Sequence, residues 1–225
     1  MNTSALLARR ILQLLVGLFF YGFALSMMIR GAVGVPPWEV LSQGVAKQTG
    51  LPFGLLVNII GALVLLLWIP IRQKPGIGTV ANVLLLGPAA EFGLAVLPVA
   101  ANVFEQVLLF AGGLALLAIA SGLYIGARFG PGPRDGLMTG IHNRWGFKIW
   151  KVRTAIEVTV LTVGWLLGGN VGLGTLAFAL FIGPMVGVTL PWLRVPTPAA
   201  TRVEPVETPV AELVEAPDTP KPALS

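Results

Sequence analysis

The sequence predicts an all-α membrane protein with six transmembrane helices arranged as an inverted 3+3 repeat. Three observations lead to this fold class: an apolar composition, a repeat at an offset of 96 residues, and basic residues that fall on one side of the expected spans. Each half should also contain a short, non-spanning helix after a Gly/Pro break, and the chain should end in a disordered tail.

The composition is typical of a polytopic membrane protein. Hydrophobic residues make up 55% of the chain and charged residues 11%, whereas a soluble domain is about 25% charged. The chain has no cysteine and one histidine, which excludes disulfides and thiolate zinc sites and argues against a transition-metal centre. We therefore expect no metal and no cofactor. Because no Ser/His/Asp constellation is recognisable, we also expect that the protein is not an enzyme.

Runs of about 20 apolar residues mark the expected spans, because a helix of that length crosses the hydrocarbon core of a bilayer. The first run follows Arg9 and Arg10 but is too long for a secretory signal, so we expect it to be retained. The six spans are expected near residues 11–29, 53–71, 77–97, 103–127, 149–168 and 173–193.

The second half of the chain repeats the first. Residues 39–88 align with residues 135–184 without a gap, and 13 of the 50 pairs are identical. A period this long indicates two copies of one large unit rather than a solenoid. We expect the first three-span unit at residues 1–97 and the second at residues 98–195.

A Gly/Pro cluster stands at the start of the repeated segment in each half and should end the preceding helix. Pro37 and Pro133 suit the first position of a new helix. Glu39 and Asp135 then fall in the first turn, where negative charge complements the helix dipole. Each new helix should be only about 11 residues long, too short to span, and should lie at the interface or dip into the membrane.

The distribution of charge supports an inverted arrangement. Three spans per copy is an odd number, so the second copy must lie upside down relative to the first. With the N-terminus inside, only Arg30 and Lys47 fall on the outer side, in agreement with the positive-inside rule. Both termini are then cytoplasmic. The other basic residues fall on the cytoplasmic side: Arg9, Arg10, Arg72, Lys74, Arg128, Arg134, Arg144, Lys148, Lys151, Arg153, Arg194, Arg202 and Lys221.

Each copy contains a Gly-x-Gly-Thr motif at the start of its last span. The motif lacks the lysine of a P-loop and the final glycine of the dinucleotide fingerprint, and no strand precedes it. We expect a tight turn that opens the helix, with threonine as a cap and glycine allowing close packing. The motif residues are Gly76, Gly78 and Thr79 in the first copy and Gly172, Gly174 and Thr175 in the second.

The acids at the two helix starts, Glu39 and Asp135, are candidates for binding a cation or a proton along a transport pathway. The alternative is that each acid caps its helix and pairs with a nearby arginine, Arg30 for the first copy and Arg128 or Arg134 for the second. Both interpretations predict the symmetry, so both stay open.

Two further acids occur in one copy only. Glu157 lies about 12 Å deep in the fifth span, with Arg153 one turn earlier. It is either a functional residue that faces the protein interior or half of a structural ion pair. Glu91 follows Gly87-Pro88 in the third span and either lines a cavity or is buried in its protonated form near the outer surface. The candidate substrate- or ion-binding residues are Glu39, Asp135, Glu91, Glu157 and Arg134.

The segment from residue 196 to 225 has a different composition. It holds seven prolines, five acidic residues and no aromatic residue. Such a segment cannot bury enough apolar surface to offset the loss of chain entropy, so it should be a disordered cytoplasmic tail. A docking or regulatory role is the alternative.

Three segments carry a resemblance to a known family: Gly34-Val-Pro-Pro-Trp-Glu-Val-Leu, Gly130-Pro-Gly-Pro-Arg-Asp-Gly-Leu-Met-Thr-Gly and Gly168-Gly-Asn-Val-Gly-Leu-Gly-Thr. They resemble signatures of the YczE/YyaS/YitT-type bacterial integral membrane proteins, over roughly residues 10–193. The resemblance implies a multi-span protein of the bacterial inner membrane whose biochemical activity is generally unassigned.

Two functions from different classes are consistent with these features. The first is a small-molecule transporter or permease with a site between the two inverted repeats. The second is a non-transporting accessory protein that assists a cytoplasmic partner through the basic loop 128–153 or the tail, and that loop could equally anchor lipid headgroups. The basic residues flank apolar runs, as membrane orientation requires, so no nucleic-acid partner is expected.

Overall fold

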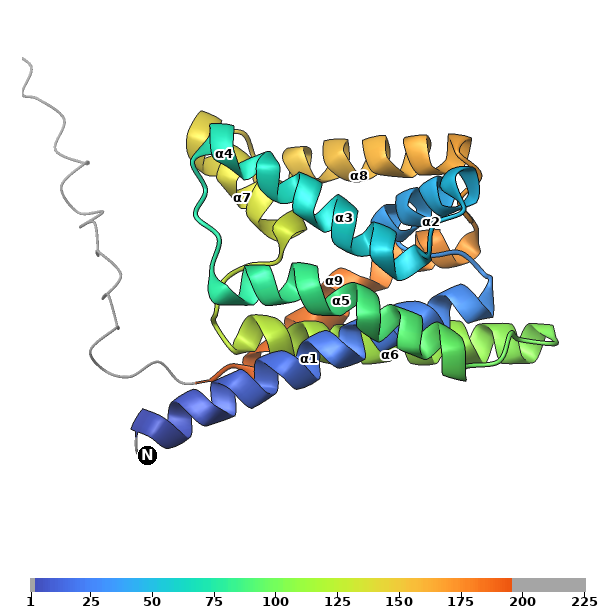
Figure 1. Cartoon of the computed structure of the whole chain (residues 1–225), viewed down its shortest axis with the longest axis horizontal. Helices are drawn as coiled ribbons and strands as arrows, with labels where there is room; N and C mark the ends of the chain where they lie inside the picture. The colour runs from blue at the N-terminus through green and yellow to red at the C-terminus, as the bar shows by residue number, and fades with distance from the viewer. Residues whose placement is uncertain (1–2, 196–225) are drawn as a thin grey trace, which may run out of the picture. The chain divides into compact units, whose positions relative to one another are not determined.

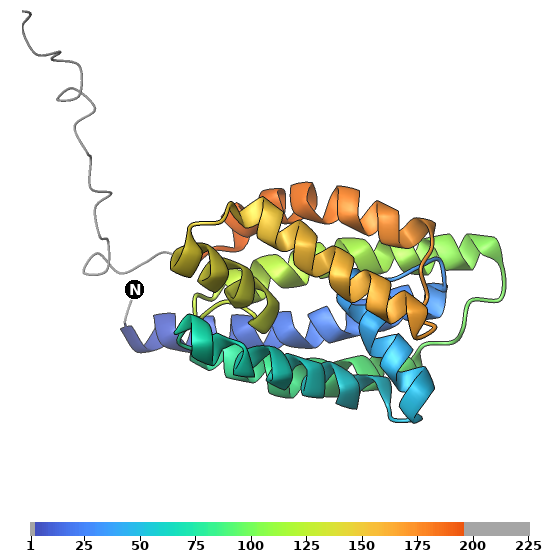
Figure 2. The same ribbon diagram turned by 90° about the horizontal axis from the view of Figure 1, so that it is seen from above.

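The computed structural model describes residues 3–195, and this part of the chain is all α-helical. The long helices run side by side, and the short helices α2 and α7 extend toward opposite ends of the bundle (Figures 1 and 2). The predicted tail, residues 196–225, lies outside the described residues. The helices are α1 (Thr3–Gly31), α2 (Pro37–Thr49), α3 (Phe53–Leu66), α4 (Trp68–Ile71), α5 (Ile77–Val96), α6 (Val103–Gly126), α7 (Pro133–Trp145), α8 (Ile149–Leu166) and α9 (Leu173–Leu193).

Five of the six expected spans have a matching helix that is long and apolar enough to cross a membrane. The sixth, expected at residues 149–168, forms α8, but the 18 residues of this helix include three charged side chains, Lys151, Arg153 and Glu157, and it is not among the candidate spans. The fold is therefore all-α with five candidate spans. These spans are Ser4–Gly31, Phe53–Ile71 (α3 continued by α4), Ile77–Val96, Val103–Gly126 and Leu173–Leu193.

The two short helices occupy equivalent positions in the repeat. Both have 13 residues, and their first residues, Pro37 and Pro133, are 96 positions apart. Proline at the start of a helix loses no hydrogen bond, because the first amides have no partner within the helix. Each helix ends at a glycine, Gly50 or Gly146, with a φ of 72°. Glycine adopts this left-handed conformation without steric cost and so stops the helix there.

Helices α1 and α6 pack against each other, and glycine residues let their backbones approach closely. Gly17 lies against the backbone of Tyr124, and Gly113 lies against the carbonyl oxygen of Ala24. Small residues at such contacts allow the close packing that holds helices together in lipid. Helix α5 packs on α1, and α9 packs on α6. In each half, therefore, the last long helix packs on the first.

The Gly-x-Gly-Thr motif of each half binds the loop that precedes the short helix of the other half. In one pair, the amide of Gly78 donates to the carbonyl of Phe129 (2.8 Å), and the hydroxyl of Thr79 donates to the carbonyl of Pro131 (2.7 Å). These bonds satisfy amides and carbonyls that the helix ends and loops would otherwise leave unpaired. The bonds of the other pair, at an offset of 96 residues, run from Gly174 to Val33 (3.0 Å) and from Thr175 to Val35 (2.8 Å).

Helices α3 and α5 are tightly packed. A methyl group at Gly87 would collide with the carbonyl oxygen of Gly54, so both positions require glycine. Pro88 has no amide hydrogen and leaves the carbonyl of Leu84 without its helical donor. The side chain of Asn58 replaces that donor (3.3 Å to Leu84 O) and accepts from the amide of Gly87 (2.9 Å). Asn58 therefore joins α3 to α5 at the proline.

Candidate functional site

The first turns of α2 and α7 come together inside the bundle, where an ion pair joins them. The Arg134 guanidinium lies 2.6 Å from Oε1 of Glu39. The Glu39 side chain is only 1% exposed and that of Arg134 is 19% exposed. A carboxylate that is almost completely buried is tolerable only with a charge partner and hydrogen bonds. This pair links two segments that are 95 residues apart in the chain.

The surroundings of Arg134 keep it charged and fix its position. Its guanidinium lies 5.1 Å from the centre of the Trp38 ring, a cation–π contact on the same short helix as Glu39. Burial is the largest single influence and by itself would lower the pKa of Arg134, but the Glu39 carboxylate together with Tyr21 and Asp135 raises the pKa above its ordinary value. At the start of α7, Trp68 donates from Nε1 to the carbonyl of Pro133 (3.0 Å) and so holds the turn that carries Arg134.

The second carboxylate oxygen of Glu39 is not satisfied. Among the residues that the structure describes, Oε2 is buried and has no hydrogen-bond partner. An unpaired buried oxygen of this kind costs free energy, and such atoms often mark a place where a ligand, an ion or water binds.

Asp135, the repeat counterpart of Glu39, is held by a tyrosine. The Tyr124 hydroxyl donates to Oδ2 of Asp135 (2.8 Å). The Tyr124 ring is buried and packs edge-to-face on Tyr21, with 5.8 Å between ring centres. These are the two tyrosines of the chain. Neither tyrosine was among the residues predicted from the sequence, although two isolated tyrosines in otherwise apolar spans are a usable signal.

Two small cavities adjoin this cluster. One, of about 50 Å³, lies beside Tyr124, Asn82 and Asp135. The other, of about 70 Å³, contacts five charged side chains and therefore forms the polar centre of the site. Those side chains are Glu39, Arg134, Asp135, Arg153 and Glu157.

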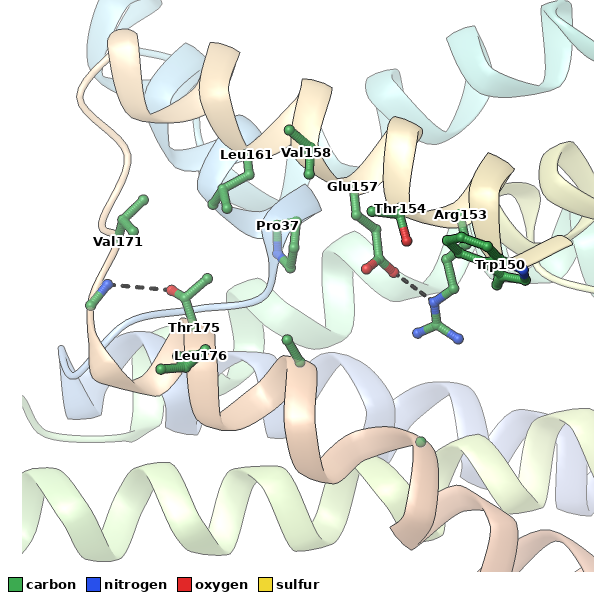
Figure 3. Close-up of a pocket in the computed structure, with 13 residues that line it drawn as sticks. Pro37, Trp150, Arg153, Thr154, Glu157, Val158, Leu161, Val171, Thr175 and Leu176 are labelled. Carbon is green, nitrogen blue, oxygen red and sulfur yellow. Dashed lines mark hydrogen bonds and ion pairs between the residues drawn. The ribbon is translucent and has the colours of Figure 1, made fainter. Parts of the chain in front are cut away.

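A much larger cavity, of about 590 Å³, separates α8 from α9 (Figure 3). Arg153 and Glu157 point into it from α8 and form an ion pair of 2.9 Å, one helical turn apart. Both residues also line the 70 Å³ cavity, as does Pro37, so the two cavities adjoin. The rest of the large cavity is mostly apolar, with Trp150 and Leu161 among its lining residues.

The comparisons with known proteins fit this membrane architecture. The family of unknown function DUF6198 matches residues 8–191. The chain belongs to this family. An uncharacterized protein of Haemophilus influenzae is 36% identical over 173 residues, which cover 77% of this chain and 79% of the relative. The uncharacterized membrane protein YczE of Bacillus subtilis is 33% identical over 177 residues, which cover 78% and 82%.

A third relative is the uncharacterized protein YyaS of Bacillus subtilis, 23% identical over 180 residues, which cover 78% of this chain and 90% of the relative. No solved structure matches the chain. The resemblance to YczE and YyaS seen in the sequence is therefore confirmed. This DUF6198 member is a multi-pass membrane protein with bacterial homologues, and its helices are embedded in a lipid bilayer.

The structure brings four of the five candidate residues of this DUF6198 protein together: Glu39, Arg134, Asp135 and Glu157 line one cavity. Glu91 lies apart, at the contact of α3 with α5. Its Oε1 accepts from the amide of Gly54 (2.6 Å), which is one of the unpaired amides at the start of α3. Among residues 3–195 no group of three or more acidic or histidine side chains is arranged to hold a metal ion.

Proposed function

We propose that this DUF6198 protein is a small-molecule transporter of the bacterial inner membrane. Residues 1–97 and 98–195 would form two inverted three-span halves, with both termini cytoplasmic. The ion pair between Glu39 and Arg134 is the observation that carries the proposal. It joins the starts of two equivalent short helices beside cavities, as in transporters whose site lies at the interface of inverted repeats.

The pairing of helices supports two inverted halves. The short helix of each half packs on a long helix of the other half: α2 on α8, and α7 on α3. Residues 33–35 and 129–131 bind the opposite Gly-x-Gly-Thr motif through equivalent hydrogen bonds. Two units related by a two-fold axis would make each such contact twice, and an odd number of spans in each unit would place that axis within the membrane plane.

Helix α8 serves as the sixth span in this proposal. Its 18 residues extend about 27 Å at the standard helical rise, close to the thickness of the hydrocarbon core. Arg153 and Glu157 line the cavity between α8 and α9 and pair with each other, which lowers the cost of placing charge at membrane depth. Toward its other end α8 exposes apolar side chains, including Val163 and Leu166, that suit contact with lipid.

The two halves differ in one respect that a transport cycle would use. Helices α3 and α5 are closed against each other, whereas the equivalent helices α8 and α9 stand apart around the large cavity. A methyl group at Gly183, the counterpart of Gly87, would meet no other residue of the described chain within 4 Å. Alternating access would exchange the open and the closed pair, so that the central site faces each side in turn.

The loop that could dock a cytoplasmic partner has a feature that favours a lipid surface instead. Trp145, Phe147 and Trp150 are exposed, and Lys148 and Lys151 lie among them. Aromatic rings and lysines are enriched at the membrane–water interface. We assign residues 145–151 to that interface. This assignment weakens the alternative of an accessory protein that acts through the loop.

Neutralising the acids of the central site should abolish transport. Glu39→Gln and Asp135→Asn remove the charges that would bind a cation or a coupling proton, while they keep the size of each side chain. Cells lacking the protein would be complemented with each variant and compared by metabolite profiling and by uptake or efflux of the solutes that change. We expect both variants to resemble the deletion strain when transport is compared per amount of folded protein.

The matched control is Glu105→Gln, because Glu105 is a partly exposed acid at the start of α6, outside the lining of the cavities. This variant should behave as wild type. If Glu39→Gln and Asp135→Asn also behave as wild type, while truncation at Pro196 abolishes the phenotype, then the proposal of transport through this core is wrong. The accessory function is then favoured.

A further inference from the structure

The unsatisfied oxygen of Glu39 indicates the chemistry of the ligand's polar group. Oε1 of Glu39 is taken by Arg134, while Oε2 has no donor among the described residues and lies in a side chain that is 1% exposed. A carboxylate oxygen accepts hydrogen bonds and cannot donate them, so its missing partner is a donor. The 70 Å³ cavity that Glu39 lines is large enough for a group the size of one or two water molecules, each of which occupies about 30 Å³.

The charges around this cavity favour a cation. Three carboxylates and two arginines line it, so the cluster carries a formal net charge of −1. A ligand with one positive charge would bring the cluster to neutrality, whereas an anion would have to displace Glu39 from Arg134. The residues are Glu39, Asp135 and Glu157 with Arg134 and Arg153.

The large cavity between α8 and α9 provides space for an apolar body. Its volume of about 590 Å³ lies within the range of small-molecule sites, about 300–1,000 Å³. It adjoins the charged cavity at Pro37, Arg153 and Glu157. Val158 and Leu176 line it from the two helices and are more than half exposed, so the cavity opens on the side where the helices present apolar residues. That side faces the lipid if α8 and α9 both span.

From these observations we infer that the site binds an amphipathic monocation. Its ammonium group would donate to Oε2 of Glu39, and its apolar body would lie between α8 and α9 after access from the bilayer. The inference rests on the proposed function, since it names the substrate class of the same central site.

Binding can be measured without transport. The purified full-length protein would be placed in phosphatidylcholine nanodiscs and titrated with dodecylammonium, dodecanoate, dodecanol and methylammonium, with empty nanodiscs subtracted. Dodecylammonium should bind at least about tenfold more tightly than dodecanoate or dodecanol, because only its head both donates and carries positive charge. Methylammonium should bind more than about tenfold more weakly, because it lacks the apolar body.

Two variants assign the parts of the site. Glu39→Gln should weaken dodecylammonium binding by about tenfold or more and leave dodecanol unchanged. Ala179→Trp fills the cavity from α9 without changing any charge and should remove the advantage of the twelve-carbon chain. Its control is Leu180→Trp, at an exposed neighbour outside the cavity lining, which should bind as wild type. The Ala179 variant keeps the test decisive if Glu39→Gln does not fold.

Tighter binding of dodecanoate would overturn the assignment of a cationic head. Equal binding of dodecanol and dodecylammonium, unaffected by Glu39→Gln, would show a groove for lipid chains only and would also overturn it. Flux in proteoliposomes separates this inference from the proposed function. Alkylammonium binding without flux of any solute would contradict transport alone, whereas flux of other solutes without alkylammonium binding would contradict the substrate class alone.

Discussion

Arg134→Met is expected to destabilise the protein by about 3–5 kcal/mol, because it leaves the carboxylate of Glu39 buried without its charge partner. The Glu39 side chain is 1% exposed and cannot regain water without local opening of the bundle. The change also removes the cation–π contact with Trp38. Thermal unfolding of the purified protein in detergent would measure the loss.

The double variant Glu39→Gln with Arg134→Met should recover most of that stability, because neither side chain is then charged. Arg144→Met is the matched control: Arg144 lies on the same helix but is exposed, so its loss should change stability by no more than about 0.5 kcal/mol. If Arg134→Met is no worse than Arg144→Met, the ion pair does not hold the two short helices together.

The second large effect is a difference in disulfide formation between the two halves. Gly61→Cys with Val83→Cys should cross-link almost completely under mild oxidation. A Cβ at Gly61 would lie 3.9 Å from the Val83 Cβ, within the range of about 3.5–4.5 Å that a disulfide needs. Thr154→Cys with Gly183→Cys should cross-link poorly, because these residues line the cavity that separates α8 from α9.

The chain has no native cysteine, so each pair can be read directly from gel mobility in native membranes. The Thr154 and Gly183 pair avoids Glu157, which is the counterpart of Gly61 and belongs to the candidate site. A ligand that drives alternating access should raise the yield of the second pair and lower that of the first. Equal yields in both pairs under all conditions would mean that α8 and α9 are not open in the membrane.

Much of the architecture could be predicted from the sequence because it depends on local signals. Apolar runs marked the long helices, and the Gly/Pro clusters marked where α2 and α7 begin. The helix ends at Gly50 and Gly146 also follow from residue type alone. The charged residues of α8 are also visible in the sequence. The cavity that they line could not be predicted, because it depends on which helices surround α8.

The partners of the acids could not be predicted in the same way. The sequence offered Arg30 as the local partner of Glu39, but the structure pairs Glu39 with Arg134 of the other half. Asp135 pairs with Tyr124 rather than with a neighbouring arginine. Such pairings depend on how the halves dock, and sequence spacing carries no information about that.

The gap between α8 and α9 was also not predicted, because a repeat suggests equal packing in both halves. The sequence does contain its physical cause. Gly54, Asn58 and Glu91 make the contact of α3 with α5. Their counterparts are Trp150, Thr154 and Gly187, which provide neither the small surface nor the same hydrogen bonds.

The measurement that tests the inverted architecture most directly is the accessibility of single cysteines at equivalent positions. Thr49 and Trp145, the last residues of α2 and α7, are 96 positions apart and both exposed. Thr49→Cys and Trp145→Cys would each be treated in intact cells with a thiol reagent that does not cross the membrane. We expect the Thr49→Cys variant to be labelled from outside the cell. The Trp145→Cys variant should be labelled only after lysis. Labelling of both positions from the same side would contradict the inverted repeat and, with it, a site between two opposed halves.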